Sequence, residues 1–265
     1  MSDVALFIHS TGLGPFMWSK LQHGLPEGVV ALTPVNRGYS PTDLLARGTP
    51  FSLADEVAHL KAQIPPGTTG VHLVGHSYGG LVALTLALDA GVPVRSLWLY
   101  EPVLFGSLLA EADTLEGEVA RHVHDLFHDP EFLLNEDTGG NVAWLERFVD
   151  YWNQPGAWAA MGEKSKAMAQ AVGWKMYQEV RMVAQEPQAF AHYRLGVPTT
   201  LVHGQHTQPP AAEMVRRLAA VNPHAEVVQL QGQGHMAVVG APEAVWPGLQ
   251  AHWGRVAGRG VQPRA

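Results

Sequence analysis

Short apolar runs alternate with segments of helical spacing along most of the chain. Six runs have the length and composition of buried strands, at residues 4–8, 29–32, 71–74, 94–100, 197–202 and 225–230. Apolar residues recur with helical spacing at residues 53–64, 81–88, 211–220 and 242–253, and a short helix begins near residue 16. Apolar strands that alternate with helices predict an α/β fold, with a mostly parallel sheet of about six strands and helices on both faces.

The pattern changes between residues 105 and 193. No run there has the character of a strand, and helical patches are separated by breaks such as Gly139-Gly140 and Pro155-Gly156. We therefore expect a helical cap, inserted after the fourth strand, over the strand ends where open α/β sheets bind ligands. The predicted division is a core at 1–104 and 194–258, a cap at 105–193 and a flexible tail at 259–265.

The stretch Gly75-His76-Ser77-Tyr78-Gly79-Gly80 follows the third apolar run and precedes a helical one. A serine between two glycines at a strand-to-helix turn is typical of a nucleophile, because the tight turn projects the hydroxyl above the sheet. Free N–H groups at the start of the helix can then stabilise a developing oxyanion. We interpret Ser77 as a catalytic nucleophile.

A serine hydroxyl needs a base near neutral pH, and His235 is the histidine best placed to supply one. It lies in a Gly-rich loop between the last predicted strand and the last predicted helix, at the same edge of the sheet as Ser77. His122, His124 and His128 have a spacing that a zinc site can use, but we interpret them as a solvated helix face. Serine chemistry needs neither a metal nor a cofactor, and we predict none.

The composition narrows the class of protein. The 265 residues include no cysteine, which excludes disulfides and thiolate chemistry, and 46% of them are hydrophobic, which predicts a sizeable core. A formal net charge of −7 argues against nucleic acid as a partner. The chain shows no apolar run of membrane-spanning length and no export signal, so we expect a cytoplasmic protein that acts on a small molecule, without a membrane partner.

Several segments together resemble the α/β-hydrolase family, in its small esterase-like branch. They are His9-Ser10-Thr11-Gly12 with Trp18, Asn36-Arg37-Gly38-Tyr39-Ser40, the stretch from Gly75 to Gly80, and Gly232-Gln233-Gly234-His235. The resemblance covers nearly the whole chain except the helical insertion. It implies a triad in the order serine, acid, histidine. Because the first strands of larger relatives are missing, it also implies an open sheet edge that would allow a homo-oligomer.

The resemblance gives two places for the triad acid. Members of the family most often carry it on the loop after the penultimate strand, where this chain has Thr207 and no nearby carboxylate. The alternative place is the end of the strand after the elbow helix, and here Glu101 closes an otherwise apolar strand. A buried carboxylate needs a partner, and the imidazole of His235 is a suitable one. We predict a Ser77–His235–Glu101 triad, with a dyad or an insertion residue such as Asp129 as alternatives.

Two backbone N–H groups are expected to hold the oxyanion. One belongs to Tyr78, the residue after the nucleophile, and the resemblance implies Thr11 as the second donor. Ser10 replaces the glycine that is usual in that loop. Tryptophans and methionines of the insertion can line an acyl pocket or form the insertion's own small core. As substrate-binding residues we predict Ser10, Trp144, Trp152 and Met236.

These features predict a serine hydrolase that cleaves small carboxylic esters or related acyl compounds through an acyl-enzyme. On the same fold, the alternatives are a C–C bond hydrolase, a lactonase and a thioesterase. A non-catalytic ligand-binding protein is the alternative from another class, and the absence of an acid at Thr207 is its only support. Haloalkane dehalogenases and epoxide hydrolases are disfavoured, because both use an aspartate at the elbow where this chain has Ser77.

Overall fold

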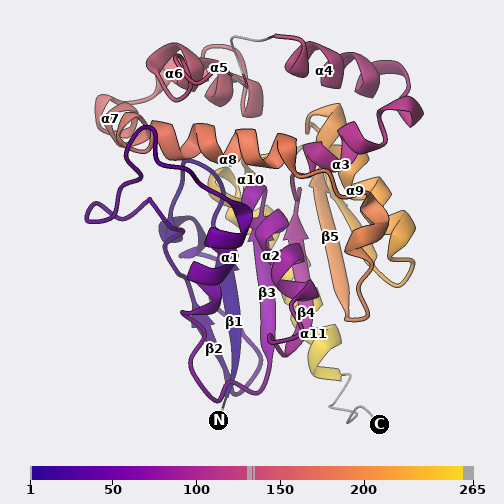
Figure 1. Cartoon of the computed structure of the whole chain (residues 1–265). Coiled ribbons are helices and arrows are strands. Elements are labelled where there is room, and N and C mark those ends of the chain that lie inside the picture. Colours follow the sequence, from indigo (N-terminus) through magenta and orange to yellow (C-terminus); the bar gives the residue numbers. More distant parts are fainter. Residues whose placement is uncertain (1, 130–132, 134, 259–265) are drawn as a thin grey trace.

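The sheet has six parallel strands in the order β2-β1-β3-β4-β5-β6 (Figure 1). The computed structural model describes residues 2–129, 133 and 135–258, so the predicted tail at 259–265 lies outside the described residues. The predicted α/β fold with a mostly parallel sheet is confirmed. The strands are β1 Asp3–Ile8, β2 Val29–Leu32, β3 Val71–His76, β4 Val94–Tyr100, β5 Thr199–Gly204 and β6 Glu226–Leu230.

Helices cover both faces of the sheet. One face is buried by α1 (Leu53–Lys61), α2 (Tyr78–Leu88) and α9 (Pro209–Val221). The other is buried by η1 (Pro15–Trp18), α10 (Ala237–Gly240) and α11 (Pro242–Gly258). Most side chains of β1, β3 and β4 are buried, which is why these strands read as continuous apolar runs. Because β2 and β3 lie on opposite sides of β1, the winding reverses there and a crevice forms at the carboxyl ends of β1 and β3.

The predicted helical cap follows the fourth strand. Figure 1 shows these helices across the carboxyl end of the sheet, with α8 running over the strands. The cap has a hydrophobic cluster of its own, built around Trp144, Trp158 and Tyr177. The division of the chain into separate core and cap domains stays a prediction. The cap elements are α3 Phe105–Ala110, η2 Ala112–Thr114, α4 Gly117–Phe127, α5 Val142–Trp152, α6 Ala157–Ala160, α7 Glu163–Ala171, α8 Gly173–Gln185 and η3 Phe190–Tyr193.

Several boundaries differ from the predicted ones. The elbow helix begins at Tyr78 rather than at residue 81, because the two glycines that follow Tyr78 lie within its first turn. The short helix near residue 16 is a single 3₁₀ turn. The last helix continues past residue 253 to Gly258, with Pro247 inside it. These differences concern helix ends and one short helical turn, where glycine, proline and short-range turns make periodicity a weak guide.

A cluster of buried polar side chains lies between the sheet and α11. His72 Nδ1 and His252 Nε2 each lie 2.9 Å from Ser96 Oγ, and His252 Nδ1 lies 2.8 Å from Thr200 Oγ1. Burial lowers the pKa of His252 to about 3, and it also lowers the pKa of His72. Both imidazoles are therefore neutral in the folded protein near neutral pH.

The free energy of unfolding is expected to fall as the pH drops below about 6.5, the ordinary histidine pKa. Below pH 6.5 the His252 side chain binds a proton in the unfolded chain but stays neutral in the folded protein. The stability contributed by neutral His252 is therefore fully present above pH 6.5 and is lost as the pH falls toward the folded pKa. At roughly 1.4 kcal/mol per pH unit, His252 alone contributes about 2 kcal/mol of loss at pH 5. Urea denaturation at pH 7 and pH 5 measures this loss. The His252→Gln variant should lose less between the two pH values, and an equal loss would contradict the assignment.

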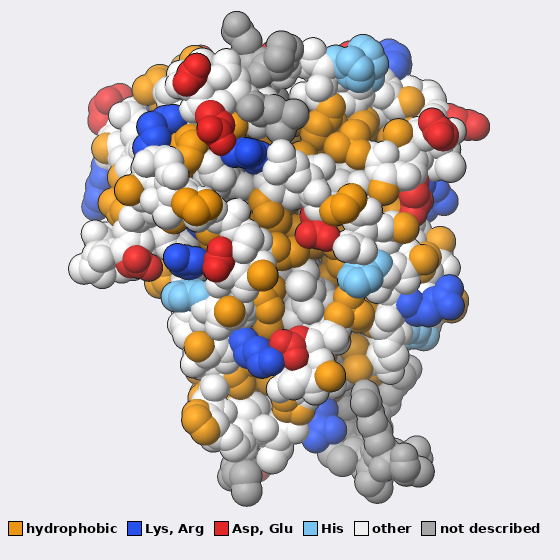
Figure 2. All heavy atoms as spheres, in the orientation of Figure 1, with side chains coloured by type: hydrophobic (Ala, Val, Ile, Leu, Met, Phe, Trp, Pro, Cys, Tyr) orange, Lys and Arg blue, Asp and Glu red, His pale blue; other side chains and the backbone are white. Residues whose placement is uncertain are grey.

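The surface carries both signs of charge. On the face shown in Figure 2, Lys and Arg side chains are interspersed with Asp and Glu side chains, and no basic patch gathers there. Among the described residues, no helix is both long enough and apolar enough to cross a membrane. The predicted absence of nucleic-acid and membrane partners stays a prediction.

Candidate active site

The turn between β3 and α2 holds Ser77 in the left-handed region, with φ 57° and ψ −122°. A non-glycine residue in such a conformation is strained and persists only where its surroundings fix it. A Cβ atom at Gly75 would lie 2.5 Å from the carbonyl oxygen of Gly79, and one at Gly79 would lie 2.3 Å from that of Ile8. The two glycines therefore permit the close approach of β3, α2 and β1 that this turn requires.

Ser77, His235 and Glu101 form one hydrogen-bonded chain. His235 Nε2 lies 3.0 Å from Ser77 Oγ, and His235 Nδ1 lies 2.6 Å from Glu101 Oε2. All three side chains are buried. If Nδ1 donates to the carboxylate, Nε2 is the acceptor that faces the serine hydroxyl. The structure thus brings together the three residues predicted from the sequence, and this arrangement can move a proton from serine to imidazole.

Glu101 follows β4 directly, and its backbone φ of 43° is also in the left-handed region. Its Oε1 atom accepts a hydrogen bond from the Gly204 N–H at 2.7 Å. Its Oε2 atom accepts one from the Thr207 hydroxyl at 2.5 Å, in addition to the contact with His235. Thr207 stands where the family usually carries the acid, and here it donates to a carboxylate that comes from another strand. These three contacts give both carboxylate oxygens of a fully buried side chain a hydrogen-bond partner.

Neighbouring aromatic groups fix the imidazole of His235. Trp152 of α5 stacks on it, with 4.0 Å between the ring centroids and 27° between the planes. The backbone carbonyl of His235 lies 2.9 Å from His76 Nε2, and the Tyr100 hydroxyl donates to the carbonyl of Gly234 at 2.8 Å. Burial holds the pKa of His76 well below its usual range, so His76 is neutral beside His235. The His235 loop is therefore held by hydrogen bonds from β3 and β4.

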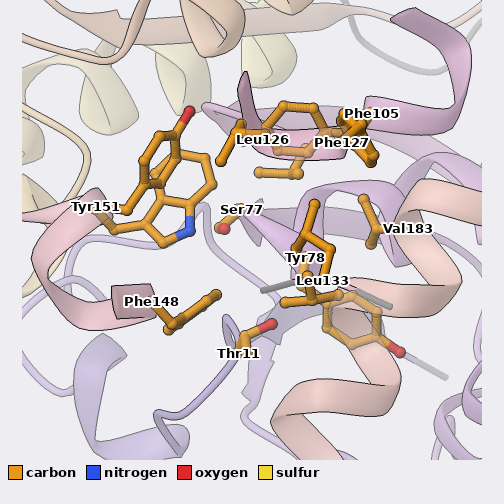
Figure 3. A pocket seen from close by; sticks show the side chains of 13 residues that line it. Thr11, Ser77, Tyr78, Phe105, Leu126, Phe127, Leu133, Phe148, Tyr151 and Val183 are labelled. Carbon is orange, nitrogen blue, oxygen red and sulfur yellow. The ribbon is translucent and has the colours of Figure 1, made fainter. Parts of the chain in front are cut away.

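The two residues predicted to donate to an oxyanion lie beside the nucleophile. Tyr78 is the first residue of α2, where backbone N–H groups have no partner within the helix. Thr11 lies on the loop after β1 and lines one cavity together with Ser77 and Tyr78 (Figure 3). The arrangement is compatible with two N–H groups acting on one oxygen, and the donor roles stay predictions.

Hydrogen bonds fix the loop that carries Thr11. His9 Nδ1 donates to the carbonyl of Ser10 at 3.0 Å, and His9 Nε2 accepts from the Asn36 N–H at 2.9 Å. These bonds need a neutral imidazole, and burial lowers the pKa of His9 to about 4. Further along, the Gly12 N–H donates to the Tyr39 hydroxyl at 2.8 Å. The loop is thereby tied to the chain segment after β2.

A fully buried ion network lies behind this loop. Lys175 Nζ of α8 lies 2.7 Å from Glu56 Oε2 of α1 and 2.6 Å from Glu179 Oε1, one turn further along α8. The Tyr39 hydroxyl donates to Glu179 at 2.7 Å, and the Tyr78 hydroxyl donates to Glu56 at 3.1 Å. Burial raises the pKa of Glu179, and Lys175 opposes that shift. The network connects the cap helix α8 to both segments that carry the expected oxyanion donors.

Two cavities meet at Ser77. The smaller has a volume of about 40 Å³, and Figure 3 shows aromatic and aliphatic side chains around Ser77. The larger has a volume of about 640 Å³ and lies under α5, α7 and the loop after β1. Ser77, Thr11, Phe148 and Trp152 line both of them. Of the predicted substrate-binding residues, Ser10 and Met236 line the larger cavity and Trp152 lines both.

Trp144 does not lie where we expected it. It is 2% exposed, stacks on Phe148 with 5.3 Å between ring centroids, and packs edge-on against Tyr177. It is absent from the lining of both cavities at Ser77, so it belongs to the core of the cap. Trp144 and Trp152 lie eight positions apart on α5, and helical periodicity alone does not tell which turn of that helix reaches the sheet.

Three residues with structural roles in the site were not predicted from the sequence. Lys175 and Glu179 are four positions apart on a helix, a spacing that usually marks a solvated pair on a surface. Thr207 was noticed only as a missing acid. The signal for its role was available, because a hydroxyl at the usual position of the acid can donate to a carboxylate that has moved next to it.

The described residues contain no group of three or more His, Cys, Asp or Glu side chains that could hold a metal ion. His124 and His128 stack on each other with 3.8 Å between ring centroids, and His122 pairs with Glu118. Asp129, the alternative acid from the insertion, forms an ion pair with Arg147.

Comparisons with known proteins agree with this fold. A stretch of 140 residues is 34% identical to part of a protein from Cupriavidus necator, the dihydrolipoyllysine-residue acetyltransferase component of an acetoin cleaving system. The alignment covers 52% of this chain and 36% of that protein. The chain thus spans about a third of that relative's length.

Solved structures superpose over nearly the whole chain. A thermophilic esterase from Thermogutta terrifontis has a TM-score of 0.67 at 18% identity, covering 97% of this chain and 91% of that one. A hydrolase from Pseudomonas aeruginosa PA01 has a TM-score of 0.66 at 19% identity, covering 96% of this chain and 90% of that one. An enol-lactonase from Burkholderia xenovorans LB400 has a TM-score of 0.62 at 16% identity, covering 95% of this chain and 91% of that one. At these identities the superpositions show the fold alone.

The sequence model of the Alpha/beta hydrolase family matches residues 5–247, from the first strand to the last helix and across the cap. The match therefore includes the elbow, the strand β4 with Glu101 directly after it, and the His235 loop. The chain belongs to the α/β-hydrolase family and is a hydrolase by its family.

Proposed function

We propose that this protein is a serine hydrolase that cleaves carboxylic esters through an acyl-enzyme. One observation carries the proposal: the buried hydrogen-bonded chain from Ser77 Oγ to His235 Nε2 at 3.0 Å, and from His235 Nδ1 to Glu101 Oε2 at 2.6 Å. A serine, a base that faces it and a carboxylate that orients the base are the parts that acyl transfer needs.

In the first half of the reaction, Ser77 Oγ attacks the ester carbonyl carbon while His235 Nε2 takes the hydroxyl proton. The carbonyl oxygen becomes an oxyanion, which the N–H groups of Tyr78 and Thr11 stabilise. Glu101 keeps the Nδ1 proton in place and stabilises the imidazolium. The tetrahedral intermediate then collapses, the bond to the alcohol oxygen breaks, and Nε2 delivers its proton to that oxygen.

In the second half, water replaces the alcohol. His235 takes a proton from the water as it attacks the acyl-enzyme, and a second oxyanion forms in the same place. Its collapse breaks the bond to Ser77 Oγ, which recovers its proton from Nε2, and the carboxylic acid leaves. The proposed cycle uses no cofactor and no metal.

The comparisons support a hydrolase, but they do not identify which type of bond it cleaves. The similar structures include proteins described as an esterase, an enol-lactonase and a meta-cleavage product hydrolase. We favour esters because both cavities at Ser77 are lined mainly by apolar side chains. A purely ligand-binding role would give no reason for the strained serine or for three hydrogen bonds onto a buried carboxylate. The cytoplasmic location and a homo-oligomer stay predictions.

The wild-type protein is expected to react with a fluorophosphonate probe and to hydrolyse p-nitrophenyl acetate. Ser77→Ala should lose both, because the probe bonds to the activated serine oxygen and the ester needs the same nucleophile. Mass spectrometry of the labelled peptide and the release of p-nitrophenol measure the two effects. Ser107→Ala, at another buried serine, is the matched control and should keep both. A folded wild type that neither reacts nor turns over would refute the proposal.

A further inference from the structure

We infer that the preferred substrates are short-chain acyl esters of bulky, uncharged, apolar alcohols. The acyl group occupies the smaller cavity at Ser77, and the alcohol occupies the larger one. The inference rests on the proposed function, because it assigns the two sides of the ester bond that Ser77 cleaves.

The position of His235 gives the direction. In an ester hydrolysis by serine, the imidazole that takes the serine proton must deliver it to the leaving alcohol oxygen, so the alcohol leaves on the imidazole side. His235 lines the larger cavity and is absent from the lining of the smaller one. Met236, the next residue, also lines the larger cavity. The alcohol therefore lies in the larger cavity, and the acyl group lies in the smaller.

The size of the smaller cavity limits the acyl chain. Its volume is about 40 Å³, which holds roughly three water-sized groups and corresponds to an acyl chain of about two to four carbons. Figure 3 shows the side chains that close it around Ser77. They come from the elbow, α3, α4, α5 and α8 and include Tyr78, Phe105, Phe127, Phe148, Tyr151 and Val183.

The larger cavity suits a bulky apolar alcohol. Its volume of about 640 Å³ is in the range of cavities that bind whole small molecules. Phe16, Val35 and Met168 line it and are 57%, 37% and 57% exposed, so its mouth presents apolar side chains to solvent. Exposed apolar side chains gathered at the mouth of a cavity are typical of a surface that receives an apolar ligand.

The charge of the site excludes a carboxylate on either part of the substrate. Among the described residues, none that lines either cavity is Asp, Glu, Lys or Arg. Lys175 is fully buried, paired with two carboxylates and absent from both linings. A carboxylate bound here would lose its hydration without a cation in exchange, in a protein whose formal net charge is −7. Esters that carry a free carboxylate on the acyl or the alcohol side are therefore poor substrates.

A pair of isomeric esters tests the direction. Octyl acetate and ethyl octanoate have the same composition and the same bond to cleave, but they exchange the short and the long side. The structure predicts that kcat/KM for octyl acetate exceeds that for ethyl octanoate by at least about tenfold, since a pocket that is too small for several methylenes excludes them strongly. Equal values, or a preference for ethyl octanoate, overturn the inference.

Cavity variants test which side each wall serves. Val183→Ala widens the smaller cavity and should move the optimum of a p-nitrophenyl ester series, from acetate to octanoate, toward longer acyl chains. Val180→Ala, in the same wall, serves if the first variant does not fold. Met168→Ala, in the wall of the larger cavity, should lower kcat/KM for octyl acetate and leave the position of the acyl optimum unchanged. A shift of that optimum by Met168→Ala but not by Val183→Ala would reverse the assignment.

The same assays separate the two levels of the proposal. If a fluorophosphonate labels Ser77 and p-nitrophenyl acetate is hydrolysed, but the isomer pair shows no preference for octyl acetate, only the substrate inference fails. If the folded protein is neither labelled nor active on any ester, the proposed function fails and takes the inference with it. A p-nitrophenyl hemisuccinate that is hydrolysed as fast as the butyrate contradicts the argument from charge.

Discussion

Replacing Glu101 with glutamine is expected to lower kcat for p-nitrophenyl acetate by about 10⁴-fold, while the protein stays folded. Glu101 Oε1 accepts from the Gly204 N–H, so the amide oxygen of glutamine must take that place and its NH₂ must face His235. An NH₂ group there needs Nδ1 as an acceptor, which moves the imidazole proton to Nε2. The atom that faces Ser77 then carries a proton and cannot accept another. Steady-state kinetics and a thermal melt of the variant measure both parts.

Two further variants make this prediction specific. Glu243→Gln makes the same change of net charge at an exposed position of α11, and it should keep wild-type kinetics. Thr207→Val removes one hydrogen bond to Glu101 and leaves the carboxylate, so it should cost roughly tenfold in kcat. If Glu101→Gln keeps full activity, Glu101 has a structural role and the catalytic acid lies elsewhere.

The juxtaposition of Ser77, His235 and Glu101 could be predicted from the sequence because each of these residues lies next to a strong local signal. Ser77 stands between glycines at a strand-to-helix turn, and His235 lies on a Gly-rich loop before the last helix. Glu101 was predicted from the resemblance, which offers the end of the strand after the elbow helix as a second place for the acid when the usual position holds Thr207. Parallel strands bring all their carboxyl ends to one edge, so residues far apart in the chain could be placed together without coordinates.

The cap could be predicted only as a region. Trp144 and Trp152 belong to the same helix, yet one is in the core of the cap and the other stacks on His235. Which turn of a cap helix reaches the sheet depends on how the helices pack, and short helices between glycine and proline breaks leave that open. The ion network around Lys175 could not be predicted for the same reason, because it depends on how the cap helix α8 packs against α1. Its partner Glu56 comes from α1, 119 positions away in the chain, and no local pattern connects them.

Replacing Lys175 with methionine is expected to lower the free energy of unfolding by about 3–5 kcal/mol at pH 8. The lysine ammonium is fully buried, 2.7 Å from Glu56 and 2.6 Å from Glu179, and methionine leaves both carboxylates without a cation. Leaving an uncompensated charge in the interior is one of the few ways in which a single substitution costs this much. Urea denaturation of the wild type and the variant measures the difference, with Lys164→Met at an exposed position of α7 as the control.

The pH dependence of this loss identifies its cause. In the variant, the folded pKa of Glu179 is expected to rise further above the unfolded value, because burial already raises it and Lys175 no longer opposes that shift. A group with a raised folded pKa keeps its stability at low pH and loses it as the pH rises. The destabilisation by Lys175→Met should therefore be smaller at pH 5 than at pH 8, and adding Glu179→Gln should reduce it at pH 8. A loss that is the same at both pH values would mean that Lys175 stabilises the fold through packing alone. The charge network would then have no part in holding the loop of Thr11 against α8.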